Sequence, residues 1–156
     1  MREFQFELFA EYHQFYLQDD DRSKGDLSDA WSQEATSRLL AVAPHVIGVG
    51  TVRNMNVPVF VTIHEARPCI HFTEWDHVTT ASLRIDTGRI VIAGCTDYFP
   101  DAERIEVEPG VYEAIVCYKN LEMLSEDGLD GEDSYHVHLF LGSEIAPAVI
   151  RNREVP

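Results

Sequence analysis

The chain has 156 residues, of which 45% are hydrophobic, and 27 acidic side chains against 12 basic ones give it a formal net charge of -15. This length fits one domain with its own core, residues 1–156, and the hydrophobic content excludes general disorder. A charge this negative repels a phosphate backbone, which proteins bind through Lys and Arg, so the composition excludes direct nucleic-acid binding and favours basic partners.

The N-terminal segment Met1–Leu8 alternates polar and apolar residues. This period of two is typical of a half-buried strand and differs from the continuous apolar block of a signal peptide. The next segment, Tyr12-His13-Gln14-Phe15, is aromatic-rich, and we predict that it lies in a core strand. A polar loop follows at residues 19–26.

One helix is predicted near residues 29–43. Ser28 can accept a hydrogen bond at its N-terminus, and Asp29 places a negative charge in the first turn, where the helix dipole favours it. Trp31, Ala35, Leu39 and Val42 recur at helical spacing and form one apolar stripe, and Pro44 marks the end.

After the helix, the period of two returns in a series of short segments separated by turn residues such as Asn54-Met55-Asn56 and Pro109-Gly110. These segments are residues 46–52, 57–63, 77–85, 89–93, 104–108, 112–118 and 135–141. With the N-terminal strand they make about eight strands, which indicates a mainly β protein: an antiparallel β-sandwich, jelly-roll-like, with a single helix.

No apolar stretch approaches the ~20 residues that cross a bilayer, so we expect no membrane association. Cys69, Cys95 and Cys117 are widely spaced and form no paired motif. We therefore expect a bacterial-type protein of the cytoplasm, without a disulfide framework, a structural zinc site or a cofactor.

The acidic residues are densest between Asn120 and Ser134, a segment that contains no base. If they lie on the surface, they can bind a basic partner, and the neighbouring aromatics of the 97–101 segment can anchor the contact. The predicted partner-binding residues are Glu122, Glu126, Asp127, Asp130, Glu132, Asp133, Tyr98 and Phe99. The same loop has oxygen ligands suited to calcium, but it lacks the ligand spacing of an EF-hand, which favours a solvated loop.

His136 and His138 form a His-x-His pair on one face of a predicted strand, and Glu144 follows six residues later. This spacing can place two imidazoles on one metal ion, as in cupins. The cupin pattern is incomplete, however, and two outward-facing strand histidines without a metal would give the same sequence. A metal-binding protein or enzyme of the cupin kind is therefore the alternative hypothesis.

Other catalytic patterns are weak. No Gly-x-Ser-x-Gly motif or phosphate-binding glycine loop is present. Asp97 and Asp101 could act as the paired carboxylates of a glycoside hydrolase, but a turn packed by Tyr98 and Phe99 explains the segment more simply. We identify no catalytic residues, and the sequence leans away from an enzyme.

Three segments resemble the competence protein J family, which includes a nuclease inhibitor of Bacillus. They are Glu11-Tyr12-His13-Gln14-Phe15 at the end of a β segment, Asp29-Ala30-Trp31-Ser32-Gln33-Glu34-Ala35 at the start of a helix, and Pro109-Gly110-Val111-Tyr112 before a strand and an acidic segment. The resemblance touches both halves of the chain, and residues 53–95 are not clearly matched. It implies a small non-catalytic protein that binds and blocks a DNA-degrading enzyme.

The leading hypothesis is therefore an acidic binding protein, an inhibitor or immunity-type partner of a basic protein such as a nuclease. A nuclease groove is basic because it attracts a polyanion, and clustered carboxylates can occupy it in place of phosphate. The sequence does not indicate an oligomeric state.

Overall fold

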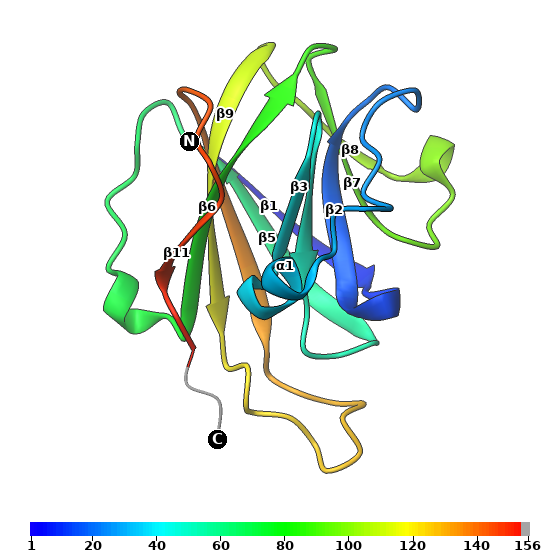
Figure 1. Cartoon of the computed structure of the whole chain (residues 1–156), viewed down its shortest axis with the longest axis vertical. Helices are drawn as coiled ribbons and strands as arrows, with labels where there is room; N and C mark the ends of the chain where they lie inside the picture. Colours follow the sequence, from blue (N-terminus) through cyan, green and yellow to red (C-terminus); the bar gives the residue numbers. More distant parts are fainter. Residues whose placement is uncertain (154–156) are drawn as a thin grey trace.

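Two β-sheets pack face to face in the computed structural model, which describes residues 1–153 (Figure 1). The first sheet has the strand order β1-β5-β10-β9-β6-β11, and the second has the order β3-β4-β2-β7-β8. The strands are β1 (Arg2–Phe9), β2 (Gln14–Asp19), β3 (Leu40–Ala43), β4 (Val46–Gly50), β5 (Asn56–Ile63), β6 (His77–Ile85), β7 (Arg89–Gly94), β8 (Glu103–Glu106), β9 (Gly110–Lys119), β10 (Ser134–Leu141) and β11 (Ala148–Arg151).

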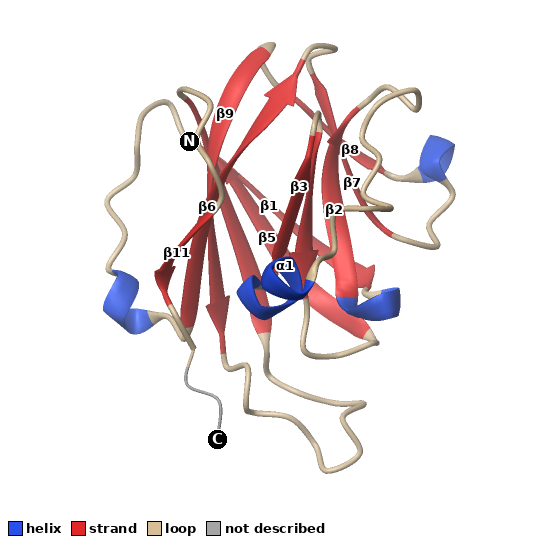
Figure 2. Ribbon diagram, viewed as in Figure 1, coloured by secondary structure: helices blue, strands red, loops and turns tan. Residues whose placement is uncertain are grey.

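The mainly β, sandwich-like fold with one α-helix is confirmed, and the helical elements are short and peripheral (Figure 2). They are the α-helix α1 (Gln33–Arg38) and the 3-10 helices η1 (Glu11–His13), η2 (Phe72–Glu74) and η3 (Phe99–Asp101). The predicted domain 1–156 includes residues 154–156, which lie outside the described part of the chain. Within that part, no helix is long and apolar enough to span a membrane.

The core lies between the sheets and follows the predicted alternation. Tyr112, Ala114, Val116 and Tyr118 of β9 all point into it, as do Tyr135, Val137 and Leu139 of β10. Successive side chains of a strand point to opposite faces, so alternate residues share one face. The face that carries these residues points into the core, and all of them are buried. Leu141, at the end of β10, continues the alternation but is exposed.

The outer face of the first sheet is partly covered as well. The connection between β5 and β6 folds over it and brings Ile70, Phe72 and Trp75 against a second cluster of buried residues. That cluster contains Val78, Ile115, Cys117 and Phe140. This cover explains why β9 is buried on both faces.

The helix is much shorter than the predicted range 29–43. It begins after Ser32, whose hydroxyl accepts a hydrogen bond from the Ala35 amide at 3.1 Å, so Ser32 rather than Ser28 is the N-cap. Leu39 ends the helix in a left-handed conformation with φ 60°, and the chain then continues as strand β3. The apolar stripe therefore spans a turn, a helix and a strand.

We predicted an antiparallel sandwich, but one pair of strands is parallel. Strands β5 and β10 pair in parallel, with Phe60 opposite His136 and Thr62 opposite His138, whereas the other strand pairs are antiparallel. Because the two strands run in the same direction, the chain enters β5 and β10 at the same end of the sandwich. The loop between β9 and β10 and the loop between β4 and β5 meet there (Figure 1).

A substitution of Gly94, at the end of β7, tests how closely the N-terminal strand approaches the second sheet. A Cβ at this position would overlap the carbonyl oxygen of Phe9, a backbone atom that no rotamer change can move. We expect Gly94→Ala to lower the free energy of unfolding by about 2 kcal/mol or more. Gly128→Ala is the control, because Gly128 has φ 73° but open space around it, so only about 1 kcal/mol of backbone strain is added.

Urea unfolding of the two variants checks this prediction. If Gly94→Ala costs no more than Gly128→Ala, the close approach of Phe9 to β7 is wrong.

Candidate functional site

The loop between β9 and β10, the acidic loop (residues 120–133), has a definite shape and projects from one end of the sandwich (Figure 1). Backbone hydrogen bonds cross it from the Ser125 amide to the Asp130 carbonyl at 2.8 Å and from the Glu132 amide to the Met123 carbonyl at 2.9 Å. Asp127 accepts bonds from the Ser125 hydroxyl and the Leu129 amide, and these bonds lower the pKa of its carboxyl. The loop is therefore a folded hairpin-like turn.

Most of the acids predicted as partner-binding are exposed on this loop. They are Glu122, Glu126, Asp127, Asp130 and Glu132. Two large apolar side chains are exposed among them, Met123 at 52% and Leu129 at 51%. The loop thus combines negative charge with apolar area, which are the two components of a protein-binding surface.

Asp133 is the exception, and its assignment to the exposed acidic surface is wrong. Its side chain is fully buried, and one carboxylate oxygen accepts a hydrogen bond from Arg53 Nε at 2.6 Å. The other accepts from the Tyr135 hydroxyl, also at 2.6 Å. Burial raises the pKa of the Tyr135 phenol, and the bond to the Asp133 carboxylate raises it further.

This buried pair connects the acidic loop to the loop between β4 and β5, residues 51–55. A second guanidinium nitrogen of Arg53 donates to the Leu129 carbonyl at 3.1 Å, and the Val52 amide donates to the Tyr135 hydroxyl at 2.9 Å. An ion pair taken out of water needs such additional bonds, because each charge loses its hydration. The position of the acidic loop is therefore set from within the fold.

Tyr98 and Phe99 do not join the acidic loop. They lie at η3, which is the yellow-green helical turn at the right of Figure 1, whereas the gold acidic loop projects from the bottom. Tyr98 is 66% exposed, but the Phe99 ring is flanked by the guanidinium groups of Arg22 and Arg104, at 5.6 and 5.3 Å from its centroid. The structure does not bring the two predicted parts of the binding site together.

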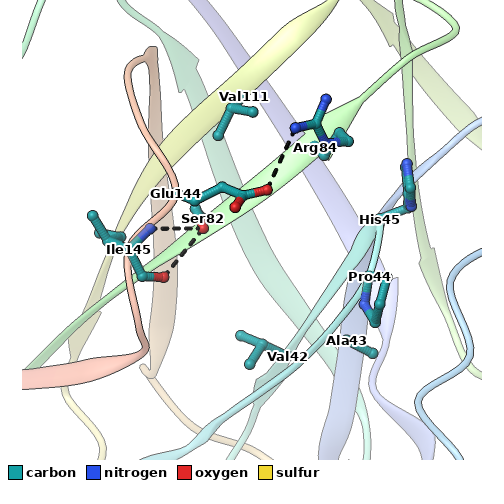
Figure 3. Close-up of a pocket in the computed structure, with 9 residues that line it drawn as sticks. All are labelled: Val42, Ala43, Pro44, His45, Ser82, Arg84, Val111, Glu144 and Ile145. Carbon is teal, nitrogen blue, oxygen red and sulfur yellow. Dashed lines mark hydrogen bonds and ion pairs between the residues drawn. The ribbon is translucent and has the colours of Figure 1, made fainter.

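The candidate metal set does not converge either. His136 stacks on Phe60 and contacts Ser134, whereas His138 Nδ1 lies 2.9 Å from Nε2 of His64. Glu144 lies elsewhere, beside Arg84 at 3.4 Å (Figure 3). His136 and His138 are the outward-facing histidines of a strand whose other face enters the core.

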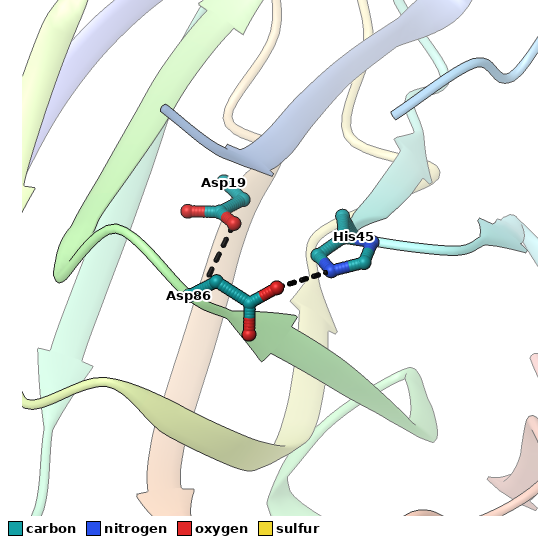
Figure 4. Close-up of side chains that lie close together, drawn as sticks. All are labelled: Asp19, His45 and Asp86. Atoms are coloured by element: carbon teal, nitrogen blue, oxygen red, sulfur yellow. Dashed lines mark hydrogen bonds and ion pairs between the residues drawn. The ribbon is translucent and has the colours of Figure 1, made fainter. Parts of the chain in front are cut away.

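In residues 1–153, one group of three side chains has ligand atoms close enough for a metal ion: Asp19, His45 and Asp86 (Figure 4). Asp19 is buried, and its carboxylate already accepts bonds from the amides of Asp86 and Thr87 and from the Thr87 hydroxyl. His45 Nε2 lies 2.9 Å from the Asp86 carboxylate. These bonds hold the turn between β6 and β7 against β2, which accounts for the group without a metal.

The hollow in Figure 3 has a volume of about 340 Å³ and lies between β3 and β6. Ser82 lines it, but its hydroxyl is bonded to the backbone amide and carbonyl of Ile145. Arg84 and Glu144 neutralise each other across it. These contacts tie the segment after β10 to β6 and do not form a nucleophile with a base.

Sequence reasoning also placed the segment at Tyr12 wrongly. Phe15 is a core residue, but Tyr12 and His13 belong to η1 rather than to a core strand, with φ 61° and 56°. They border a cleft of about 640 Å³ whose walls include Trp31, Leu39 and Val52. A tyrosine rarely adopts positive φ, so no residue pattern indicated this turn.

The fold is shared with a characterised protein. The crystal structure of ComJ, inhibitor of the DNA degrading activity of NucA, from Bacillus subtilis, superposes with a TM-score of 0.69 over 90% of this chain and 98% of that one, at 18% sequence identity. The chain has the ComJ fold. The structure of "Crocagin biosynthetic gene J" also superposes, with a TM-score of 0.60 over 92% and 100% of the two chains, at 12% identity.

No protein-family model and no curated protein sequence matches the chain. The likeness to ComJ therefore lies in the structure: the resemblance seen in the sequence at Tyr12, Trp31 and Pro109 corresponds to a common fold over nearly the whole of both proteins.

The structural role of the buried ion pair between Arg53 and Asp133 can be tested by removing the acid. Asp133→Ala leaves the Arg53 guanidinium buried without its carboxylate, and we expect a loss of about 3–5 kcal/mol in the free energy of unfolding. Asp130→Ala removes an exposed acid from the same loop and should change stability by less than about 0.5 kcal/mol. Urea unfolding compares the two variants, and equal losses would contradict the structural role of Asp133.

The outer-face histidines make stability depend on pH. Burial lowers the pKa of both His136 and His138 to about 4 from an ordinary value of 6.5. The two imidazoles therefore bind protons more tightly in the unfolded chain than in the folded one. The contribution of the neutral, buried histidines to stability is complete above about pH 6.5 and is lost as the pH falls towards 4.

We expect the urea midpoint to fall between pH 7 and pH 5, and to fall less in His136→Phe, which keeps the stacking on Phe60 but cannot be protonated. An identical pH dependence in the variant would show that His136 is not desolvated in the folded protein.

Proposed function

We propose that this protein inhibits a DNA-degrading nuclease by binding it through the acidic loop. The observation that carries the proposal is the fold, which matches over nearly its full length a protein described as an inhibitor of the DNA degrading activity of NucA. The site geometry supports a binding function, because Ser82 of the hollow in Figure 3 and two of the predicted metal ligands, His136 and Glu144, are engaged in structural contacts.

The charge of the acidic loop fits this partner. Five exposed carboxylates lie on a loop of fixed shape, and Arg53, which contacts the loop from residues 51–55, is buried and paired. A groove that binds DNA presents Lys and Arg to phosphates. The loop therefore offers such a groove a substitute for phosphate, without the protein itself binding nucleic acid.

We place the complex in the cytoplasm of a bacterium. Cys69, Cys95 and Cys117 are free thiols, which suits a reducing compartment. Burial also raises the pKa of the Cys117 thiol to about 12, so this cysteine stays protonated and unreactive in the core.

Nuclease assays test the proposal. Purified protein is added to NucA and, separately, to an extract of the source bacterium, and the degradation of linear DNA is followed. We expect at least one of these activities to be lost. The inhibition should weaken between about 0.1 M and 1 M salt, because the screening length falls from roughly 10 to 3 Å and exposed charges then attract each other less.

Two charge variants of equal net charge show where the inhibition originates. Glu126→Gln, Asp130→Asn and Glu132→Gln together remove three of the five exposed carboxylates of the acidic loop, and we expect about tenfold weaker inhibition. Glu103→Gln, Glu106→Gln and Glu108→Gln together neutralise exposed acids on and beside β8 and should leave inhibition nearly unchanged. Full activity of both nucleases at every concentration of the wild-type protein would contradict the proposed function.

A further inference from the structure

The 3-10 helix η1 holds an exposed tyrosine in a strained backbone conformation. Tyr12 and His13 are consecutive residues with positive φ, and Leu39, across the cleft from them, is a third. Each such conformation costs of the order of 1–3 kcal/mol in a residue other than glycine, and it persists only where the surrounding structure imposes it.

The loop between β4 and β5 imposes it here. The Tyr12 amide donates to the Asn54 side-chain oxygen at 2.6 Å, and the Thr51 amide donates to the His13 carbonyl at 2.9 Å. The Ala10 amide bonds the Met55 carbonyl at 3.0 Å, and Nδ1 of His13 lies 3.2 Å from the Thr51 carbonyl. These bonds use the backbone of η1 and leave the direction of the Tyr12 side chain fixed.

The Tyr12 side chain itself contributes little to the fold. It is 70% exposed, whereas Phe15, three residues later, is fully buried in the core. A glycine would adopt this backbone without strain. The folded chain therefore accepts a strained backbone at a residue whose aromatic ring it does not bury, and a large exposed aromatic of this kind is typical of an interface.

Tyr12 and the acidic loop belong to one continuous end of the sandwich. Residues 51–55 bond η1 on one side and, through Val52 and Arg53, bond Tyr135, Asp133 and Leu129 on the other. Figure 1 shows the three segments together at the lower end, with η1 in blue, residues 51–55 in turquoise and the acidic loop in gold. Within these three segments the exposed large apolar side chains are Tyr12, Met123 and Leu129.

The cleft beside Tyr12 has room for a partner's side chain. Its wall carries the Trp31 indole, whose nitrogen donates to the Gln14 side-chain oxygen at 2.8 Å and is thereby fixed in place. Leu39 and Val52 supply aliphatic surface, and Arg153 lies at the edge. Arg153 and Arg151 also border the Glu122 side of the acidic loop. The base beside Glu126 to Glu132 is Arg53, which is buried and paired with Asp133.

We propose that Tyr12 and its cleft are the apolar centre of the surface that docks on a basic nuclease. The partner inserts an aliphatic or aromatic side chain beside Tyr12 and places its Lys and Arg residues against the acidic loop. The charge complementarity between that loop and a DNA-binding groove identifies the occupant. This inference rests on the proposed function and adds the residue on which affinity depends most.

Tyr12→Gly separates binding from folding. The variant removes both the ring and the backbone strain, while glycine adds flexibility to the unfolded chain, so these two effects on stability roughly cancel. We expect the melting temperature to stay within about 3 °C of the wild type. Inhibition of whichever nuclease the wild-type protein blocks, NucA or that of the source extract, should weaken at least about 30-fold.

Tyr98→Ala is the matched control. Tyr98 has almost the same exposure, 66%, but lies at η3, and its loss should change inhibition less than about threefold. Tyr12→Phe should keep most of the inhibition, because the ring rather than the hydroxyl fills the contact.

The outcomes separate the two proposals. Inhibition by the wild-type protein that Tyr12→Gly retains in full would overturn the role of Tyr12 and leave the proposed function intact. A greater effect of Tyr98→Ala than of Tyr12→Gly would move the interface to η3. Absence of inhibition by the wild-type protein would overturn both.

Discussion

The ion pair between Arg53 and Asp133 is the constraint on which this end of the molecule depends. Both side chains are buried, and such a pair is stable only where further bonds replace the lost hydration. Tyr135 and the carbonyl of Leu129 supply them, so one contact fixes the start of β10, the acidic loop and the loop between β4 and β5. The exposed acids keep a constant arrangement because one acid of the same run is turned into the core.

Much of the fold could be predicted from the sequence, because a half-buried strand records its two faces as a period of two. β9 and β10 follow that pattern, with Val116 and Val137 inward and the histidines of β10 outward. The predicted helix was too long because Trp31, Ala35, Leu39 and Val42 have helical spacing. In the structure the chain leaves the helix at Leu39 and continues in β3. The parallel pairing of β5 with β10 depends on contacts between distant segments, which local patterns do not contain.

The candidate site was predictable only in part, for physical reasons that differ between residues. Exposed acids such as Glu126 follow from composition, but the burial of Asp133 requires Arg53, 80 residues away in the chain. A turn packed by Tyr98 and Phe99 was the simpler interpretation of that segment, so the sequence did not indicate the exposure of Tyr98. Its distance from the acidic loop is a matter of topology. The strain at Tyr12 has no signature in residue type, since positive φ is usual for Gly or Asn, so the sequence pointed to a strand there.

Hydrogen exchange of the protein alone and in complex with the nuclease it inhibits tests the central claim most directly, because it maps the contact without any substitution. The account predicts that binding slows exchange of backbone amides in residues 11–14, 51–55 and 121–133, which form one end of the sandwich. Amides of η3 near Tyr98 should exchange at the same rate in both states. Protection confined to η3 or to the opposite end of the sandwich, with the acidic loop unchanged, would contradict it.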